Sequence, residues 1–208
     1  MASNSVSIGE ILPDITDKYD LVILWSYKKI VSQVGNRNNV ILFHSSDLPE
    51  GKGWAPIYNA ITHDKQYYTI SGLFAGDKVD EGDIIVKARF QMKDNYTASY
   101  IRKWDHEISI MLISKILERF NNRPIQGIKQ DRKESFYKKR NPEDNEISVN
   151  TTLNAAINHL RACEGNHPAF FYYNSIRYNI LIEPAEPPSF PDDLEIIFFD
   201  NAALQSNE

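Results

Sequence analysis

Two short runs of consecutive apolar residues constrain the fold of this chain most strongly. Residues 21–25 read Leu-Val-Ile-Leu-Trp, and residues 40–43 read Val-Ile-Leu-Phe. Runs of this length without polar alternation are typical of strands that are covered on both faces, as in sheets with helices packed on each side. The sequence therefore predicts an α/β fold in which residues 20–26 and 40–43 are buried strands.

Apolar periodicity predicts further strands and helices along the chain. Residues 67–74 and 84–92 alternate in the manner of strands, the second with one wetter face. A helix is expected to begin near Pro56, because proline suits the first turn of a helix. Apolar residues at three- and four-residue spacing predict a long helix over residues 97–119. A short helix is also expected over residues 28–34.

The last third of the chain is expected to form a smaller unit. Residues 121–150 are charged and loop-rich, and residues 153–162 have the pattern of an amphipathic helix. Apolar and aromatic residues on both sides of Asn174-Ser175 predict a β-hairpin. Residues 195–199 are expected to form a last strand.

These patterns suggest a division into a core, residues 1–145, and a C-terminal helix and hairpin subdomain, residues 146–208. The hairpin can either pair with its copy in a homodimer or pack on its own domain, and the sequence leaves both open.

Composition excludes several classes of protein. Of 208 residues, 42% are hydrophobic and 25% charged, as in ordinary globular domains. The net charge of −5 argues against general affinity for nucleic acid, which requires a basic surface. A single cysteine, Cys163, excludes an intrachain disulfide and a thiolate zinc cluster, and no metal site is expected. No leader pattern or membrane-length apolar run is present, so a cytoplasmic protein without a membrane partner is expected.

The strand at residues 40–43 runs into His44 and a loop rich in proline and glycine. In an open α/β sheet, strand carboxyl ends face the crevice where ligands bind. Asp80 follows another apolar stretch, in the turn Val-Asp-Glu-Gly-Asp. Alone, His44 is well explained as a histidine satisfied at a strand end, and Asp80 as a turn carboxylate. Together they favour a pair that handles protons, because a carboxylate fixes the tautomer and charge of an imidazole.

The segment HSSDLPEGKGWAPIYNAI, followed by VDEGDII, resembles the catalytic signature of formyltransferases that use 10-formyl-tetrahydrofolate. The family pattern is a histidine, a Leu-Pro pair and a Gly-rich turn, and then an aspartate in an Asp-x-Gly-Asp turn. Residues 23–30 resemble the folate-side strand and loop. SFYKKRNPEDNEIS and INHLRACEGNHPAFFYYN resemble the C-terminal part of the sugar-nucleotide N-formyltransferases. The resemblance covers residues 20–182.

The resemblance implies an α/β fold with an abbreviated Rossmann-like formyltransferase core and a small C-terminal helix plus β-hairpin extension. Family members carry a longer segment before the histidine, with a Gly-rich first βα unit, so part of the folate site is expected to be built differently here. The chain also has Leu42 where the family usually has an asparagine that helps polarise the formyl oxygen. Either Ser45, Ser46 or a main-chain amide supplies that contact, or catalysis relies on His44 and Asp80.

The resemblance also assigns roles to residues. It implies that His44 and Asp80 are catalytic and that a formyl group passes directly to a primary amine, with no metal and no covalent intermediate. The positions implied for binding 10-formyl-tetrahydrofolate are Ser26, Tyr27, Gly76, Asp77, Lys78 and Val79. The positions implied for binding the acceptor are Gly51, Lys52, Gly53 and Trp54. Lys52 is either a phosphate contact or a solvated lysine.

The acceptor implied by the C-terminal likeness is a nucleotide-linked amino sugar of the 4-amino-4,6-dideoxyhexose type. Such sugars serve bacterial surface polysaccharides and nonulosonic acids, including pathways of the pseudaminic acid type. The acidic net charge favours this acceptor over tRNA. The alternatives are a formylating domain for a carrier-bound aminoacyl group or methionyl-tRNA, and a non-catalytic folate- or nucleotide-binding protein, which Leu42 would suit.

Overall fold

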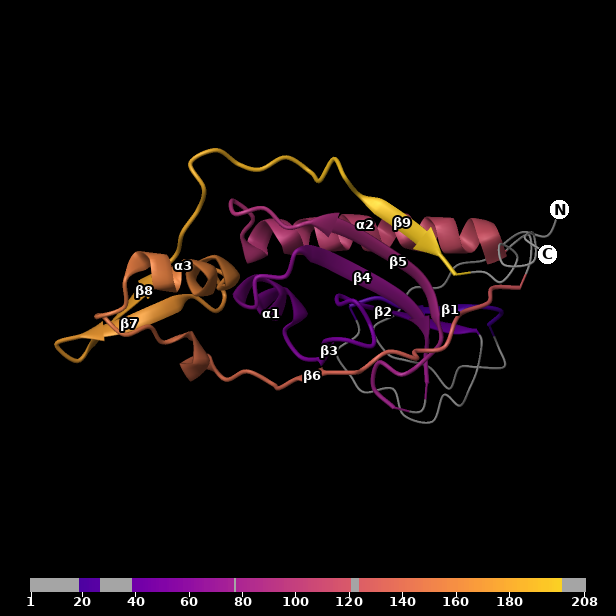
Figure 1. The fold of residues 1–208 in the computed structure, drawn as a ribbon, viewed down its shortest axis with the longest axis horizontal. Coiled ribbons are helices and arrows are strands. Elements are labelled where there is room, and N and C mark those ends of the chain that lie inside the picture. Colours follow the sequence, from indigo (N-terminus) through magenta and orange to yellow (C-terminus); the bar gives the residue numbers. More distant parts are fainter. Residues whose placement is uncertain (1–18, 27–38, 77, 121–123, 200–208) are drawn as a thin grey trace.

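A mixed five-stranded sheet forms the centre of the computed structural model, which describes residues 19–26, 39–76, 78–120 and 124–199 (Figure 1). The strand order is β1-β2-β4-β5-β9; β1 and β2 are parallel, and each later neighbour is antiparallel. The strands are β1 (Val22–Leu24), β2 (Val40–His44), β4 (Tyr67–Phe74), β5 (Ile84–Gln91) and β9 (Glu195–Phe198). The α/β fold expected from the sequence is confirmed.

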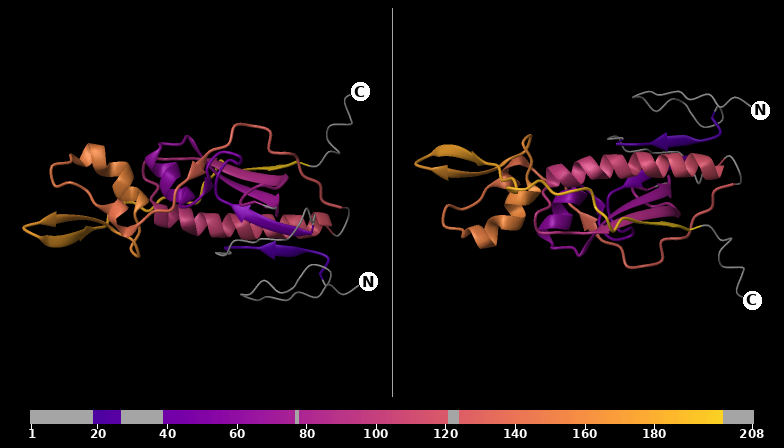
Figure 2. Two further views of the ribbon diagram at one scale, coloured as in Figure 1. Left: turned by 90° about the horizontal axis from the view of Figure 1, so that it is seen from below. Right: turned by 90° about the horizontal axis from the view of Figure 1, so that it is seen from above.

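The long helix α2 (Ala98–Phe120) runs along the length of the sheet and supplies most of the core on that side (Figure 2). Its buried stripe has the three- and four-residue spacing read from the sequence, whereas the apolar side chain of Met111 on the same helix is exposed. The stripe packs on the inward residues of β4 and β5. The core side chains shared by these elements include Tyr68, Ile70, Ala88, Phe90, Ile101, Trp104, Ile108 and Leu112.

Shorter elements surround the end of β2. The two-residue strand β3 (Lys52–Gly53) pairs in parallel with β6 (Phe136–Tyr137). Helix α1 (Pro56–Thr62) follows with proline at its start, as expected. A short 3-10 helix, η1, spans Pro142–Asn145.

A helix and a hairpin project from one end of the molecule (Figure 1). They are α3 (Leu153–Ala162), β7 (Ala169–Tyr173) and β8 (Ile176–Ile180). Asn174 and Ser175 both have positive φ, the conformation that a two-residue type I′ turn requires. The chain then returns and adds β9 to β5, so the C-terminal segment also supplies a strand to the central sheet. The division into 1–145 and 146–208 stays a prediction.

The predicted elements match the structure closely, with one difference at the sheet edge. β1 is shorter than residues 20–26 and lies at the edge of the described sheet, where Val22 and Ile23 are only half-buried. The helix expected over residues 28–34 lies outside the described residues. Among the helices that are described, none is long and apolar enough to cross a membrane.

Candidate active site

His44 and Asp80 meet at the carboxyl end of β2. His44 is buried, and its Nδ1 lies 3.4 Å from Asp80 Oδ2. Its Nε2 lies 2.9 Å from the carbonyl oxygen of Gly51. A carbonyl oxygen only accepts hydrogen bonds, so Nε2 carries a proton in this arrangement. The two ring nitrogens thus face two acceptors, the carbonyl of Gly51 and the carboxylate of Asp80.

The loop between β4 and β5 carries Asp80 back toward His44. Because β4 runs antiparallel to β2, its last residue, Phe74, lies beside Ile41, at the other end of β2 from His44. The loop doubles back, and Asp80 adopts φ 56°. Gly82 permits the close return, since a Cβ there would lie 1.7 Å from the carbonyl oxygen of Phe74.

The loop after His44 supplies the backbone around the pair. The amide of Gly53 donates to Asp80 Oδ2 at 3.0 Å. Gly53 has φ 94°, and a Cβ on it would lie 2.7 Å from the carbonyl oxygen of Tyr137. A glycine is therefore required where β3 passes β6. The loop binds both members of the pair through main-chain atoms, His44 through Gly51 and Asp80 through Gly53.

Lys52 is buried rather than solvated. The residue is 2% exposed, and its Nζ lies 2.8 Å from Glu134 Oε2 and 3.7 Å from Glu81 Oε1. The ammonium is thus held by two carboxylates next to Asp80, which overturns the alternative of a solvated lysine. Trp54 is 51% exposed, and Lys139 Nζ lies 5.0 Å from the centre of its ring. Among the predicted acceptor positions, Trp54 offers the largest open side chain.

Four of the six predicted folate positions fall within the described residues. Ser26 is exposed and follows β1, beside the carboxyl end of β2. Gly76, Lys78 and Val79 lie in the loop that leads to Asp80, and the last two are exposed. Tyr27 and Asp77 lie outside the described residues. The described positions flank His44 and Asp80 and leave surface open beside them.

Sequence reasoning missed a hydrogen-bonded network behind the histidine. Ser45 Oγ and Tyr68 Oη each donate to Asp105 Oδ2 at 2.6 Å. Tyr68 is buried, and burial together with the Asp105 carboxylate raises its pKa well above the ordinary value, so its hydroxyl keeps its proton. The network ties the residue after His44 to α2. The sequence pattern of α2 identifies only its apolar side. It contains no signal that pairs Asp105 with Ser45 or Tyr68, which are far away in the sequence.

The position of the family asparagine is apolar in this structure. Leu42 packs among apolar neighbours, including Leu24 and Leu73. Of the groups considered as a replacement, Ser45 is engaged by Asp105. Ser46 Oγ is buried and has no hydrogen-bond partner within the described part of the chain. Ser46 therefore remains the hydroxyl with unused bonding capacity in this loop.

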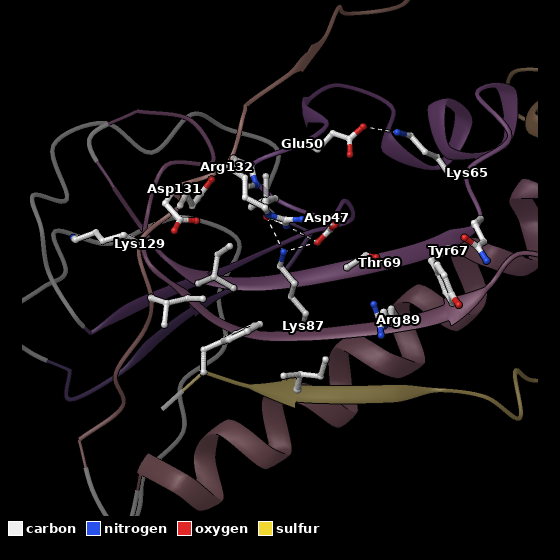
Figure 3. Close-up of a pocket in the computed structure, with 18 residues that line it drawn as sticks. Asp47, Glu50, Lys65, Tyr67, Thr69, Lys87, Arg89, Lys129, Asp131 and Arg132 are labelled. Atoms are coloured by element: carbon white, nitrogen blue, oxygen red, sulfur yellow. Dashed lines mark hydrogen bonds and ion pairs between the residues drawn. The ribbon is translucent and has the colours of Figure 1, made fainter. Parts of the chain in front are cut away.

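A cavity of about 460 Å³ lies behind the loop, and neither His44 nor Asp80 lines it (Figure 3). Lys87 and Arg132 converge there on Asp47. Burial alone would raise the pKa of Asp47, but its hydrogen bonds to these two cations lower it below the ordinary value. Burial lowers the pKa of Lys87. Ion pairs thus brace a cavity that is lined by residues 47–50 of the loop and not by His44 or Asp80.

No group of three or more His, Cys, Asp or Glu side chains that could hold a metal ion occurs among the residues the structure describes.

Comparison with known proteins gives one family and several relatives. Residues 15–116 match the model of a family described as formyl transferase. The methionyl-tRNA formyltransferase of Pelagibacter ubique is 27% identical over 169 residues, which cover 78% of this chain and 54% of that protein. That of Fusobacterium nucleatum is 28% identical over 159 residues, 74% of this chain and 51% of that protein. The chain thus spans about half the length of the curated relatives it matches.

Solved structures share the fold at low identity. Methionyl-tRNA formyltransferase from Clostridium thermocellum superposes with a TM-score of 0.63 at 23% identity, covering 85% of this chain and 78% of that one. A sugar N-formyltransferase from a Shewanella species gives 0.68 at 18%, covering 82% and 72%. HypX from Aquifex aeolicus, in complex with tetrahydrofolic acid, gives 0.65 at 16%, covering 84% and 32%.

Proposed function

Because the chain belongs, through residues 15–116, to the formyl transferase family, we propose that it transfers a formyl group from 10-formyl-tetrahydrofolate to a primary amine. The observation that carries the proposal is the pairing of His44 with Asp80 at the end of β2. The open surface at Ser26 and along the loop that precedes Asp80 supports a folate site beside the pair. A neighbour of the same fold has been solved with tetrahydrofolic acid.

The two side chains have complementary roles in this reaction. Attack of a neutral amine on the formyl carbon places negative charge on the formyl oxygen. The Nε2–H of His44, which donates to Gly51 in this structure, is the donor for that oxygen. Asp80 faces Nδ1 and orients the ring, and its carboxylate receives the proton that the amine loses. The bond between the formyl carbon and the folate nitrogen then breaks, and that nitrogen takes the proton as tetrahydrofolate leaves. Ser46 Oγ is the candidate for the second contact to the oxyanion.

For the acceptor we propose a nucleotide-linked amino sugar of the 4-amino-4,6-dideoxyhexose type, of use in bacterial surface glycans or nonulosonic acids such as pseudaminic acid. The net charge of −5 supports a small acceptor over a large polyanion. Trp54, with Lys139 over its ring, offers an aromatic face and a cation of the kinds that bases and phosphates bind. A sugar N-formyltransferase is among the neighbours in fold.

Methionyl-tRNA is the second candidate acceptor. The curated relatives named above are methionyl-tRNA formyltransferases. The segment after α2 also carries exposed cations, among them Lys133, Lys138 and Lys139, which suit a phosphate backbone. A carrier-bound aminoacyl group and a non-catalytic folate-binding role remain the further alternatives.

A panel of acceptors tests the proposal. The protein is incubated with 10-formyl-tetrahydrofolate and, separately, with 4-amino-4,6-dideoxyhexoses linked to dTDP, UDP or GDP, and with methionyl-tRNA. Formylated product is detected by its mass. Formylation of a sugar nucleotide is the expected result, and formylation of methionyl-tRNA alone would select the second candidate. Tetrahydrofolate binding without turnover on any acceptor would contradict the proposed enzyme activity.

We also propose that the protein forms a homodimer through β8 of the projecting hairpin, on which Ile176 and Tyr178 are exposed.

A further inference from the structure

A strap, residues 128–137, crosses both loops that carry the catalytic pair. It follows α2 and ends at β6, beside β3 (Figure 1). It lies outside residues 15–116, the part of the chain that matches the family model. Residues 129 and 131–134 are exposed, whereas Gln130 and Ser135 are half-buried against the two loops. The strap thus presents Gln130 and Ser135 to the site.

Gln130 binds the turn of Asp80. Its Nε2 donates to the carbonyl oxygens of Asp80 and Gly82, at 2.9 and 2.8 Å. A primary amide has two N–H groups, so one side chain can hold both carbonyls. Asp80 has φ 56°, which a residue with a Cβ adopts at a cost, so the turn needs bonds from outside to keep this conformation. Two main-chain hydrogen bonds between Ile84 and Ile128 fix the strap beside it.

Ser135 binds the other loop. Its Oγ accepts from the amide of Gly51 at 2.9 Å, and its own amide donates to the carbonyl of Pro49 at 3.3 Å. The carbonyl of Ser135 accepts from the amide of Lys52 at 2.9 Å. Gly51 is the residue whose carbonyl accepts from His44 Nε2. Ser135 therefore fixes the acceptor that faces one nitrogen of His44, and Gln130 fixes the turn whose carboxylate faces the other.

We propose that the strap is a positioning device for the catalytic pair, in which Gln130 and Ser135 set the two acceptors that face the His44 ring. The expected effect of the strap on turnover rests on the proposed function, whereas its expected effect on the His44 ring does not. Neither residue reaches the reacting atoms, and each acts through main-chain groups of a loop. A displacement of about 1 Å in a catalytic group costs on the order of a hundredfold in rate, so small changes in the strap have large effects.

Gln130→Met tests the device, because methionine matches the length of glutamine and lacks its donors. Asp131→Met is the matched control, since it places the same new side chain at an exposed position of the same strap. The first readout is kcat and KM with the acceptor that is formylated in the panel. The second is the ring 15N signals of His44 at fixed pH, identified among the five histidines by their loss in His44→Gln. Asp80→Asn supplies the reference spectrum for a lost carboxylate.

Gln130→Met is expected to lower kcat about ten- to a hundredfold with little change in KM. The His44 ring signals are expected to move toward those of Asp80→Asn, and Asp131→Met is expected to change neither readout. Unmoved ring signals in Gln130→Met would overturn the proposal whatever happens to kcat. If that variant does not fold, Ser135→Ala gives the same test on the Gly51 arm. If the wild-type chain formylates no amine, the proposed function fails, while the ring signals still decide the role of the strap.

Discussion

At the scale of single residues, His44 is the centre of the site because both of its ring nitrogens face acceptors. A carboxylate oxygen lies 3.4 Å from Nδ1, and a carbonyl oxygen lies 2.9 Å from Nε2. In the proposed reaction a substrate oxygen can displace the carbonyl of Gly51 as the acceptor of the Nε2–H hydrogen bond. An oxygen that develops negative charge is the stronger acceptor for that N–H. The carboxylate of Asp80 faces Nδ1, which leaves Nε2 as the nitrogen available to the substrate in the proposed reaction.

His44→Ala and Asp80→Ala are each expected to lower kcat by about a hundredfold or more, as the loss of an oxyanion donor or acid–base group does. The measurement is the initial rate of formyl transfer to the acceptor found in the panel. Thermal unfolding and tetrahydrofolate binding of both variants serve as controls for folding and for the folate site. Near-normal turnover by either variant would show that the residue has no catalytic role.

At the scale of elements, α1 and α3 are joined by a half-buried tyrosine–histidine contact. Tyr58 Oη lies 2.9 Å from His159 Nδ1, and the Arg140 guanidinium lies 3.2 Å from the centre of the Tyr58 ring. Burial lowers the pKa of His159 below 6.5, and the nearby Arg140 charge acts in the same direction. His159 Nε2 is buried without a hydrogen-bond partner in the described structure. A neutral His159 therefore links α3 to α1, the helix that follows the loop after His44.

The free energy of unfolding is expected to depend on pH through His159. Its pKa is lower in the folded protein than in the unfolded chain, so below about pH 6.5 the unfolded chain binds the extra proton. This contribution to stability is present above pH 6.5 and is lost as pH falls through the lowered folded value. Urea unfolding between pH 7.5 and 5 measures it. His159→Gln should reduce the dependence, and His167→Gln, at an exposed histidine, should not. Equal slopes in wild type and His159→Gln would refute the assignment.

Elements and site differ in how far the sequence predicts them. Strand and helix positions follow from local periodicity, as the match of residues 67–74 with β4 and 153–162 with α3 shows. The sequence also predicts that His44 and Asp80 lie together, because their motif is local at each end. It does not predict the contacts of Gln130 and Asp105, since each joins loops or elements far apart in sequence. It does not predict the burial of Lys52 either, because that depends on where Glu134 returns to the site.

At the scale of the whole molecule, the central sheet and the projecting hairpin differ in how their strand edges are paired. β9 covers one edge of β5, where Arg89 also pairs with Glu195. The hairpin, in contrast, projects from the other end, and β8 has no second strand partner among the described residues (Figure 1). Unpaired strand edges with apolar side chains readily pair with another chain. A second copy of the same strand satisfies this edge around a two-fold axis.

The expected homodimer follows from the exposed side chains of β8. Ile176 is 57% exposed and Tyr178 is 44% exposed. Tyr173, the last residue before the hairpin turn, is 60% exposed. Light scattering after size exclusion should give twice the chain mass of 24.0 kDa.

Ile176→Lys combined with Tyr178→Lys should raise the dimer dissociation constant about tenfold or more, because charges on an edge strand oppose pairing. Ile110→Lys, at a comparably exposed position of α2, is the matched control and should leave the mass unchanged. A monomeric wild-type chain at high micromolar concentration would remove the dimer. An unaltered dimer in the double variant would place the interface on another surface.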